Sequence, residues 1–417
     1  MEFNKFKLKE LLQVNPRMTL KKGSKAKKIA MENIKEFQKK IDNFTIEEFK
    51  SGSKFQNGDT LLARITPCLE NGKTAYVDIL EDDEIAFGST EFFVLRPIDN
   101  KLDSQFLYYL FRTKKVREII IKSMTGTSGR QRAQKDSILE YECEVPTIEY
   151  QRKIAIILKN LDDKIEINKK IIANLEELSQ TLFKHWFVGF EFPDKDGKPY
   201  KSNGGEMIDS ELGKIPKGWI VKSLDEIANY INGLAMQKYP SNKEESLPIV
   251  KIKELKNGFT DENSNRCTTE IPEKAKIDNG DIIFSWSATL LVKMWAGGKA
   301  GLNQHLFKVT SETFPKWFYY LWTKRYIEYF INIANDKATT MGHINRKHLS
   351  HAKIVLPTQL QLENFDKIFH NLLEKQLNTE EEIKRLIELR DTLLPKLMSG
   401  ELEISDDIEV NSDEFSI

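Results

Sequence analysis

Two polar loops carry side chains suited to recognising nucleic acid. The first is Thr125-Gly-Thr-Ser-Gly129, which is followed by Arg130, Gln131, Arg132 and Lys135. The second is Ala338-Thr-Thr340, which is followed by His343, Asn345, Arg346 and Lys347. Guanidinium and ammonium groups bind phosphates, arginine also binds guanine in a bidentate manner, and side-chain amides bind adenine. The two loops therefore predict a surface that reads base edges.

The same residue types also occur in ordinary solvated loops, so each residue taken alone fits either interpretation. The loop occurs twice, with different side chains each time, and this favours recognition. Lys73 is added as an exposed lysine after a turn. The predicted DNA-binding residues are Lys73, Thr127, Ser128, Arg130, Gln131, Arg132, Lys135, Thr339, Thr340, His343, Asn345, Arg346 and Lys347.

Catalytic and metal-binding patterns are weak. Glu70-Asn-Gly-Lys-Thr74 resembles the end of a phosphate-binding P-loop, but Pro67 stands where the motif requires its first glycine. His343, His348 and His351 lack the spacing and neighbouring carboxylates of a metal site, which favours polar loop histidines. The sequence shows no nucleophile-and-base arrangement and no glycine-rich cofactor turn. We therefore expect no catalytic residues, no bound cofactor and no metal.

Composition limits the class of protein. The chain has 417 residues, enough for two or more domains, and its net charge of zero excludes a uniformly basic surface. Cys68, Cys143 and Cys267 are far apart, which indicates reduced thiols. No charged-then-apolar leader opens the chain and no apolar run approaches eighteen residues, so we expect a cytoplasmic protein without membrane contact.

The elements that must position the loops are organised around a long helix that occurs twice. Apolar residues with a period of 3.5 predict a helix with a coiled-coil seam between Pro146 and Trp186. Adding 211 to each number gives a second such seam. The first seam is Ile154, Leu158, Leu161, Ile165, Asn168, Ile172, Leu175, Ser179 and Leu182, and the second is Phe365, Phe369, Leu372, Gln376, Thr379, Ile383, Leu386, Arg390 and Leu393.

The segments before the two helices also match each other. Phe106-Leu-Tyr-Tyr-Leu-Phe111 corresponds to Trp317-Phe-Tyr-Tyr-Leu-Trp322 at the same offset, and both are more typical of core than of base stacking. The Asn57-Gly-Asp59 turn and following strand correspond to Asn279-Gly-Asp281. The opening of each repeat matches at an offset nearer 216. We interpret this pattern as an internal duplication with variable loops.

The predicted fold class is α+β, with two similar domains separated by two long antiparallel coiled-coil helices and related by a pseudo-two-fold internal repeat. Neither helix can bury its apolar seam alone, so we expect the two to pack together. The predicted segments are domain 1 at 1–145, helix 1 at 146–188, a linker at 189–215, domain 2 at 216–356, helix 2 at 357–400 and an acidic tail at 401–417.

Three motifs resemble the specificity subunit of type I restriction-modification systems. They are Leu182-Phe-Lys-His-Trp-Phe-Val-Gly-Phe-Glu-Phe-Pro193, Ser210-Glu-Leu-Gly-Lys-Ile-Pro-Lys-Gly-Trp219 and Leu394-Pro-Lys-Leu-Met-Ser-Gly-Glu-Leu402. Pro67-Cys-Leu-Glu-Asn-Gly-Lys73 also looks like a loop of this family. The resemblance implies two target recognition domains, each reading one half of a split DNA site, with the helices setting the spacing between the halves.

The resemblance also implies partners. Two modification subunits would methylate adenine with S-adenosylmethionine, and ATP-dependent restriction subunits would join them, so these cofactors and Mg are expected in the partners and not in this chain. The residues alone leave a second interpretation open, a coiled-coil adaptor that joins two protein-binding modules and reads no DNA. On either interpretation, Lys169, Lys170, Glu176 and Glu177 are candidate docking residues on the helices, or simply solvated ones.

Overall fold

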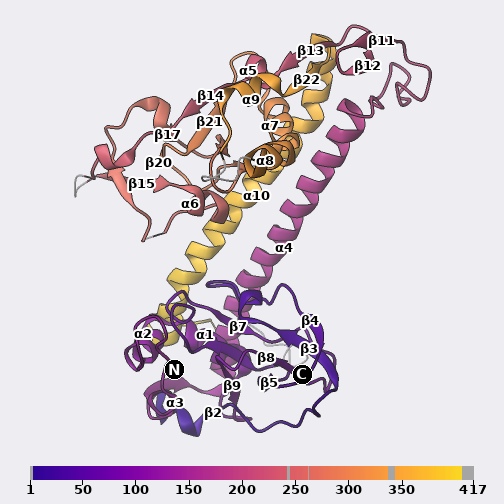
Figure 1. Ribbon diagram of the computed structural model, residues 1–417. Coiled ribbons are helices and arrows are strands. Elements are labelled where there is room, and N and C mark those ends of the chain that lie inside the picture. The colour runs from indigo at the N-terminus through magenta and orange to yellow at the C-terminus, as the bar shows by residue number, and fades with distance from the viewer. Residues whose placement is uncertain (1–2, 242–244, 262, 337–342, 406–417) are drawn as a thin grey trace. The chain divides into compact units, whose positions relative to one another are not determined.

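The computed structural model of the chain describes residues 3–241, 245–261, 263–336 and 343–405 (Figure 1). The chain divides into two compact units. Unit 1 comprises 1–166 and 386–417, and unit 2 comprises 167–385. The two long helices, α4 (Ile148–Phe187) and α10 (Gln359–Ser399), each contribute one part to each unit. Residues 406–417 of the predicted acidic tail lie outside the described part of the chain.

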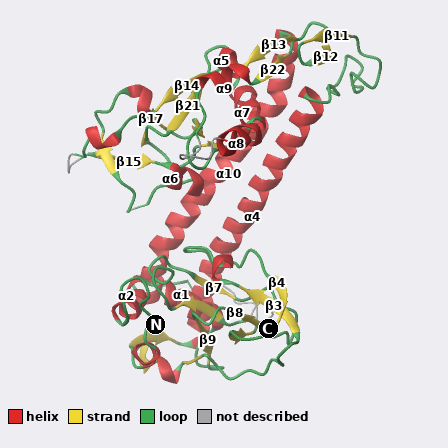
Figure 2. Ribbon diagram, in the orientation of Figure 1, coloured by secondary structure: helices red, strands yellow, loops and turns green. Residues whose placement is uncertain are grey.

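Unit 1 contains two four-stranded sheets and a two-stranded pair, with helices before and after the last strand (Figure 2). The strand orders are β2-β9-β6-β7, β4-β3-β8-β5 and β1-β10. The elements are β1 (Phe3–Lys7), η1 (Leu8–Glu10), β2 (Leu12–Val14), β3 (Lys25–Ile29), η2 (Met31–Asn33), β4 (Thr45–Glu48), β5 (Ser53–Phe55), β6 (Thr60–Ala63), β7 (Thr74–Tyr76), β8 (Ala86–Gly88), β9 (Phe92–Pro97), α1 (Ser104–Arg112), α2 (Lys114–Lys122), α3 (Lys135–Leu139) and β10 (Glu142–Pro146).

Unit 2 repeats this topology. Its strand orders are β14-β21-β18-β19, β16-β15-β20-β17 and β13-β22, with an added hairpin of β11 and β12. The elements are β11 (Met207–Ser210), β12 (Gly213–Pro216), β13 (Ile220–Ser223), α5 (Leu224–Ile227), β14 (Asn229–Asn232), η3 (Met236–Lys238), β15 (Ser246–Val250), α6 (Ile252–Asn257), β16 (Arg266–Thr268), η4 (Glu273–Ala275), β17 (Lys276–Ile277), β18 (Ile282–Ser285), β19 (Leu291–Met294), β20 (Ala300–Leu302), β21 (Leu306–Thr310), α7 (Lys316–Arg325), α8 (Ile327–Asp336), α9 (Arg346–His351) and β22 (Lys353–Leu356).

Strand register identifies equivalent residues in the two units. Lys7 lies opposite Glu142 in unit 1, and Ser223 lies opposite Lys353 in unit 2, which gives offsets of 216 and 211. In the central sheets, Ala63 lies opposite Phe92 and Ser285 lies opposite Leu306. The residue numbers of equivalent positions therefore differ by 222 between β6 and β18 and by 214 between β9 and β21. The predicted duplication is confirmed, and the drift in offset arises in loops of different length.

The core of each unit forms where an aromatic helix covers the central sheet. In α1 the run from Phe106 to Phe111 is buried, and in α7 the run from Trp317 to Trp322 is buried. The prediction that these runs are core and not base-stacking platforms is therefore confirmed. The α1 helix begins where the Asp103 carboxylate accepts a hydrogen bond from the Phe106 amide at 2.9 Å, a normal N-cap.

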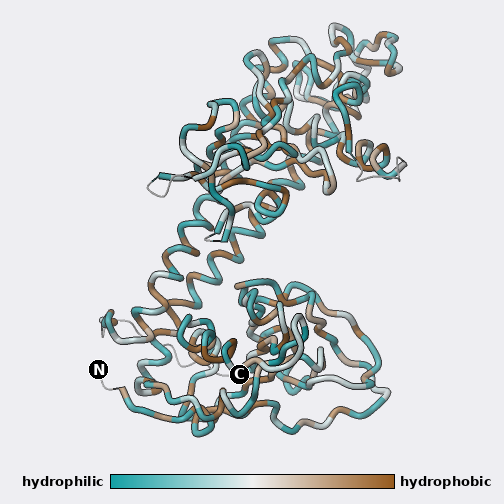
Figure 3. The backbone as a smooth tube through the Cα atoms, turned by 60° about the vertical axis from the view of Figure 1, so that its left-hand side comes forward, coloured by the Kyte–Doolittle hydropathy of each residue, from teal (hydrophilic) through white to brown (hydrophobic). Residues whose placement is uncertain are grey.

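The two long helices pack against each other in each unit, and they run antiparallel there. In unit 2, Trp186 lies 4.9 Å from Phe365 and Phe183 lies 6.3 Å from Phe369, both measured between ring centroids. In unit 1, Asp162 contacts Arg390. All eighteen predicted seam positions are buried or half-buried. Figure 3 shows the corresponding alternation of hydrophobic and hydrophilic residues along the helices.

The segment predicted as a linker has structure of its own within unit 2. It contains the β11–β12 hairpin, and the Phe192 ring stacks between Tyr200 and Trp219 at 4.6 Å and 5.0 Å. The Asp194 carboxylate accepts hydrogen bonds from the backbone amides of its own turn. Asp194 and Asp196 therefore belong to one turn. The segment predicted as a linker thus consists of turns and hairpin strands that pack on their own aromatic residues.

Candidate nucleic-acid interface

The first polar loop of unit 1 is a short closed hairpin. Thr125 and Arg132 exchange two backbone hydrogen bonds at 3.1 Å and 2.9 Å, and Gly126 and Gly129 take positive φ values of 126° and 77° that favour glycine. The side chains of Thr127, Ser128 and Arg130 at its tip are exposed. The loop therefore presents the predicted residues to solvent on a backbone fixed at both ends.

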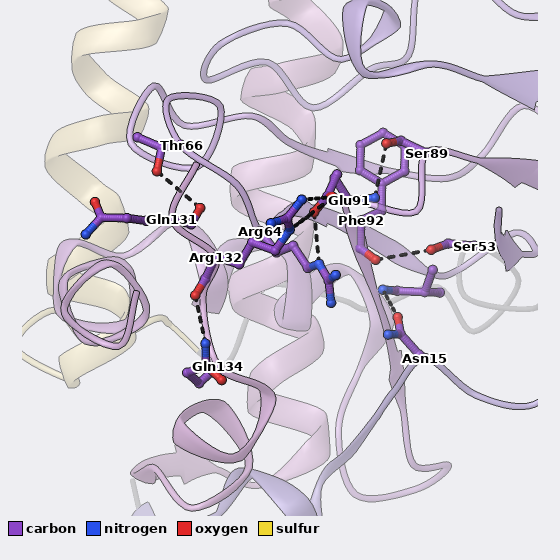
Figure 4. Close-up of polar contacts among 11 residues, drawn as sticks. Asn15, Ser53, Arg64, Thr66, Ser89, Glu91, Phe92, Gln131, Arg132 and Gln134 are labelled. Atoms are coloured by element: carbon purple, nitrogen blue, oxygen red, sulfur yellow. Dashed lines mark hydrogen bonds and ion pairs between the residues drawn. The ribbon is translucent and has the colours of Figure 1, made fainter. Parts of the chain in front are cut away.

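The base of this loop is fastened to the central sheet. The Ala133 amide donates to the Arg64 carbonyl at 2.8 Å, and the Thr66 amide donates to the Gln131 carbonyl at 3.1 Å. The Arg64 amide in turn donates to the Glu91 carbonyl at 3.0 Å. Figure 4 shows how these three segments bring Arg64, Glu91 and Arg132 together.

Glu91 lies between two guanidinium groups. Arg132 donates from Nε and Nη2 to the Glu91 carboxylate at distances of 2.7–3.1 Å, and Arg64 donates from Nε at 3.1 Å. The hydrogen bond from Arg132 is the largest influence on the pKa of Glu91 and lowers it, partial burial opposes this, and Arg64 adds to the lowering. The group is thus ionised at neutral pH and carries one excess positive charge.

The remaining predicted residues of unit 1 have different settings. Lys135 is exposed at the first turn of α3. Lys73 is half-buried, and its ammonium donates to the Met31 carbonyl at 2.8 Å. The expectation of an exposed lysine at this turn was therefore wrong, because the chain folds back over it. Thr127, Ser128, Arg130 and Arg132 are gathered in one loop, while Lys73 is engaged elsewhere.

In unit 2, Thr339 and Thr340 lie outside the described residues. His343 is exposed, and its ring centroid lies 6.4 Å from that of Trp286. Asn345 is the N-cap residue of α9, and its backbone amide donates to the His348 Nδ1 atom at 3.2 Å. The exposed Arg346 donates to the Tyr230 carbonyl at 3.2 Å, and Lys347 is exposed.

His348 and His351 lie in the short helix α9 and not in a loop, which corrects the predicted setting of these two residues. Among the described residues, no group of three or more histidine, cysteine, aspartate or glutamate side chains is placed to hold a metal ion. In the same part of the chain, no helix is both long and apolar enough to cross a membrane.

In unit 1, backbone hydrogen bonds join Ala133 to Arg64 and Arg64 to Glu91, and we call this arrangement the frame. Unit 2 has the same frame with different side chains. In unit 2 the Ile344 amide donates to the Trp286 carbonyl at 3.1 Å, and the Trp286 amide donates to the His305 carbonyl at 3.4 Å. These bonds correspond to those of Ala133, Arg64 and Glu91 in unit 1. The isolated bridges also correspond, since Ile65 pairs with Arg132 and Ser287 pairs with His343. Trp286, His305 and His343 thus occupy the places of Arg64, Glu91 and Arg132.

Sequence reasoning found Arg132 and His343 but missed the other four positions of this frame. Arg64 and Trp286 each follow a strand that comes after an Asn-Gly-Asp turn, and this shared position was a usable signal. Glu91 and His305 could not be matched without the strand register, because the loops before them differ in length. The frame is therefore a product of the tertiary structure.

Two repeats of one mixed domain, each presenting exposed polar side chains from an equivalent frame, define a duplicated recognition protein. Comparison with known proteins identifies its family. Residues 1–177 and 216–389 match the family model described as the type I restriction modification DNA specificity domain. This match covers more than half of the chain.

Individual relatives agree with the family match. The chain is 31% identical over 311 residues to the type I restriction enzyme MjaIX specificity subunit of Methanocaldococcus jannaschii, covering 73% of this chain and 70% of that protein. It is 27% identical over 409 residues to the HindI specificity subunit of Haemophilus influenzae, covering 83% and 87%. The crystal structure of a type I restriction-modification S subunit from M. genitalium has the same fold, with a TM-score of 0.53, 17% identity and 97% coverage of both chains.

The chain belongs to the family of type I restriction-modification DNA specificity proteins. The alternative of a coiled-coil adaptor that reads no DNA is not favoured by this membership.

Proposed function

We propose that this chain is the sequence-specificity subunit of a type I restriction-modification complex. Each unit reads one half of a split, asymmetric DNA site, and the chain itself performs no chemical step. One observation carries the proposal. The two units share a topology and a backbone frame, yet the exposed side chains on that frame differ, as expected of two domains that read two different sequences.

Binding rests on local cations because the net charge of the chain is zero. Arg130 and Lys135 in unit 1 and Arg346 and Lys347 in unit 2 are exposed next to the two frames. Such groups contact phosphates and release counterions, so affinity falls as salt rises. Base-edge contacts then discriminate among sequences that the phosphate contacts treat alike.

The proposed partners are modification and restriction subunits, which would bring S-adenosylmethionine, ATP and Mg. The long helices offer exposed residues for docking, including Lys170 and Glu177, together with exposed apolar residues Ile167 and Leu178. The Glu176 side chain is 39% exposed, but it already forms an ion pair with Lys324 of α7, so Lys170 and Glu177 are the better candidates for docking.

The proposal is tested by assembling the chain with its modification subunit and measuring methylation and binding on randomised DNA. We expect one split sequence with a fixed spacer, and no methyl transfer by the chain alone. Methylation by the isolated chain would refute the non-catalytic role. A complex that binds every sequence equally would refute the reading role.

A second measurement separates DNA reading from the adaptor alternative. Replacing Arg130, Arg132, Arg346 and Lys347 with alanine removes two exposed cations from each loop region and leaves Lys135 in place. We expect lower DNA affinity and a smaller salt slope, by about one for each lost phosphate contact. Unchanged affinity and slope would show that these loops are not the DNA-binding surface.

A further inference from the structure

Three equivalent positions of the two frames hold different side chains in the two units. In unit 1 they hold Arg64, Glu91 and Arg132, joined by ion pairs of 2.7 Å and 3.1 Å. In unit 2 they hold Trp286, His305 and His343. The ring centroid of Trp286 lies 5.9 Å from that of His305 and 6.4 Å from that of His343. The surrounding strands and backbone hydrogen bonds are the same. The fold therefore tolerates two unrelated side-chain sets at these positions.

The ion pairs of unit 1 are not explained by stability. The side chains of Arg64 and Arg132 are 31% and 44% exposed, and an ion pair at that exposure contributes little to folding. In unit 2 the same backbone frame forms with Trp286, His305 and His343, so it requires neither a guanidinium nor a carboxylate at these positions. A partly exposed ion-pair cluster that the fold does not require is a candidate for binding.

The geometry of Arg132 suits a particular ligand. A guanidinium has five N–H donors, and Glu91 accepts from Nε and from one hydrogen of Nη2. The Glu91 carboxylate does not use the edge formed by Nη1 and Nη2. By holding the opposite edge, however, the carboxylate fixes the direction in which the Nη1–Nη2 edge points. A fork held in this way matches the O6 and N7 acceptors of guanine in the major groove.

Glu91 is a positioning residue in this arrangement. The Glu91 amide donates to Ser89 Oγ at 3.1 Å, and Arg64 holds the carboxylate from the other side. The Arg64 guanidinium itself lies 5.6 Å from the centre of the Phe93 ring. The hydrogen bond to Ser89 holds the backbone of Glu91, and the bond from Arg64 holds its carboxylate. The carboxylate in turn orients the Arg132 guanidinium (Figure 4).

We propose that Arg132, oriented by Glu91 and Arg64, reads a guanine in the half-site of unit 1, and that Trp286, His305 and His343 read the other half-site at the equivalent place by a different chemistry. This inference rests on the proposed function. In unit 2 the exposed His305 ring lies 3.3 Å from both Ser287 Oγ and Gln304 Nε2, and the described residues supply no guanidinium at these three positions. The half-site of unit 2 is thus not read by an oriented arginine at this point.

The test uses the chain assembled with its modification subunits and DNA randomised in both half-sites. Arg132→Ala should reduce the preference for guanine at one position of one half-site by roughly 10- to 100-fold and leave the other half-site unchanged. Arg132→Lys keeps the charge but loses the fork, so it should lose the guanine preference while keeping most of the total affinity. Glu91→Gln should weaken the same preference at the same position.

Glu140→Gln is the matched control. Glu140 also lies between two cations, Lys7 at 2.8 Å and Lys9 at 2.6 Å, and it is exposed in the same unit. The charge change is identical, but Glu140 is outside the frame, so the base preferences should not change. A melting curve for each variant shows that it is folded, and the lysine variant provides the answer if the alanine variant does not fold.

The outcomes separate this inference from the proposed function. Suppose that the wild-type complex reads a split sequence and that Arg132→Ala and Arg132→Lys both keep the base preferences of the wild type. This result would overturn the inference and leave the proposed function intact. A wild-type complex without sequence preference would overturn both. Loss of guanine preference in the half-site assigned to unit 2 would also overturn the inference.

Discussion

Buried charged residues join the first domain to the long helices within unit 1. Lys39 is buried, and its ammonium lies 3.2 Å from the Tyr109 hydroxyl and 4.9–5.6 Å from the centres of three tyrosine rings. The Tyr109 hydroxyl donates to Asp162 on α4 at 2.7 Å, and Arg390 on α10 donates to the same carboxylate at 2.7 Å. One carboxylate thus serves a domain residue and a residue of the second helix.

Replacing Asp162 with asparagine should destabilise unit 1. Arg390 would keep only its ion pair with the half-exposed Asp391 at 2.8 Å, and the buried Lys39 would lose the attraction of Asp162. Removing one member of a buried ion pair typically costs about 3–5 kcal/mol. Urea denaturation measures the change in the free energy of unfolding. Asp163→Asn is the control, since the direct ion pair of Asp163 is a half-exposed one with Lys159 at 3.0 Å, and the loss there should be below about 1 kcal/mol. Equal losses in both variants would contradict the buried-pair explanation.

Lys39 should also make stability depend on pH. Burial lowers its pKa to about 8 in the folded chain, although Asp162 and Asp163 act in the opposite direction. Between pH 8 and the ordinary lysine value of 10.5, the unfolded chain binds more protons than the folded chain. The folding free energy contributed by Lys39 is therefore least favourable below pH 8, and it becomes more favourable as pH rises through that range.

The measurement compares the wild-type chain with Lys39→Met. The difference in stability between the two should shift in favour of the wild type by about 2 kcal/mol between pH 8 and 9.5, because each unit of pH in that range is worth about 1.4 kcal/mol. Other titrating groups occur in both chains and cancel in the difference. A difference that does not change with pH would mean that Lys39 keeps its ordinary pKa.

At the scale of elements, the seam of the two long helices contains polar residues that differ in how they are satisfied. Ser179 and Thr379 donate to the carbonyl four residues earlier at 2.7 Å, as serine and threonine often do in helices. Asn168 is 1% exposed, and its Nδ2 atom has no hydrogen-bond acceptor among the described residues. A polar residue at such a seam position can instead serve to set the register of the two helices, which is a second hypothesis for Asn168.

Asn168→Leu should stabilise unit 2. The change removes a buried donor without an acceptor and adds apolar area, so we expect the free energy of unfolding to rise by about 1–3 kcal/mol. The midpoint of urea denaturation measures this. Asn174→Leu, at an exposed position of α4, should change it by less than about 0.5 kcal/mol. A lower midpoint for Asn168→Leu would instead favour the register role, because polar seam residues set register at a cost in stability.

At the scale of the whole molecule, α4 and α10 are the elements that run through both units. α4 has 40 residues and α10 has 41, and neither is interrupted where the chain divides between Glu166 and Ile167 or between Arg385 and Leu386. Two continuous helices are suited to fixing the spacing between two DNA half-sites. The spacing role implied by the family resemblance can be tested by changing their length.

Inserting one heptad at both of these points preserves the seam and lengthens each helix by about 10 Å. The preferred spacer should then lengthen by about three base pairs, at roughly 3.4 Å each, while both half-sequences stay the same. Selection from DNA with randomised half-sites and variable spacers measures this. Inserting the heptad in one helix only should lower stability because the seams no longer match. An unaltered spacer in the doubly extended chain would refute the spacing role.

The sequence alone determined the duplication, the two helices, their seams and the aromatic core, because each of these is a local periodicity or a repeat at a fixed offset. It also located the two polar loops. Tertiary structure decided which residues meet. Arg64, Glu91 and Arg132 come from two strand ends and a loop, and Asp162 meets Arg390 only because the chain folds back on itself. Side-chain hydrogen bonds between segments far apart in sequence leave no periodic trace, so they could be found only in the folded chain.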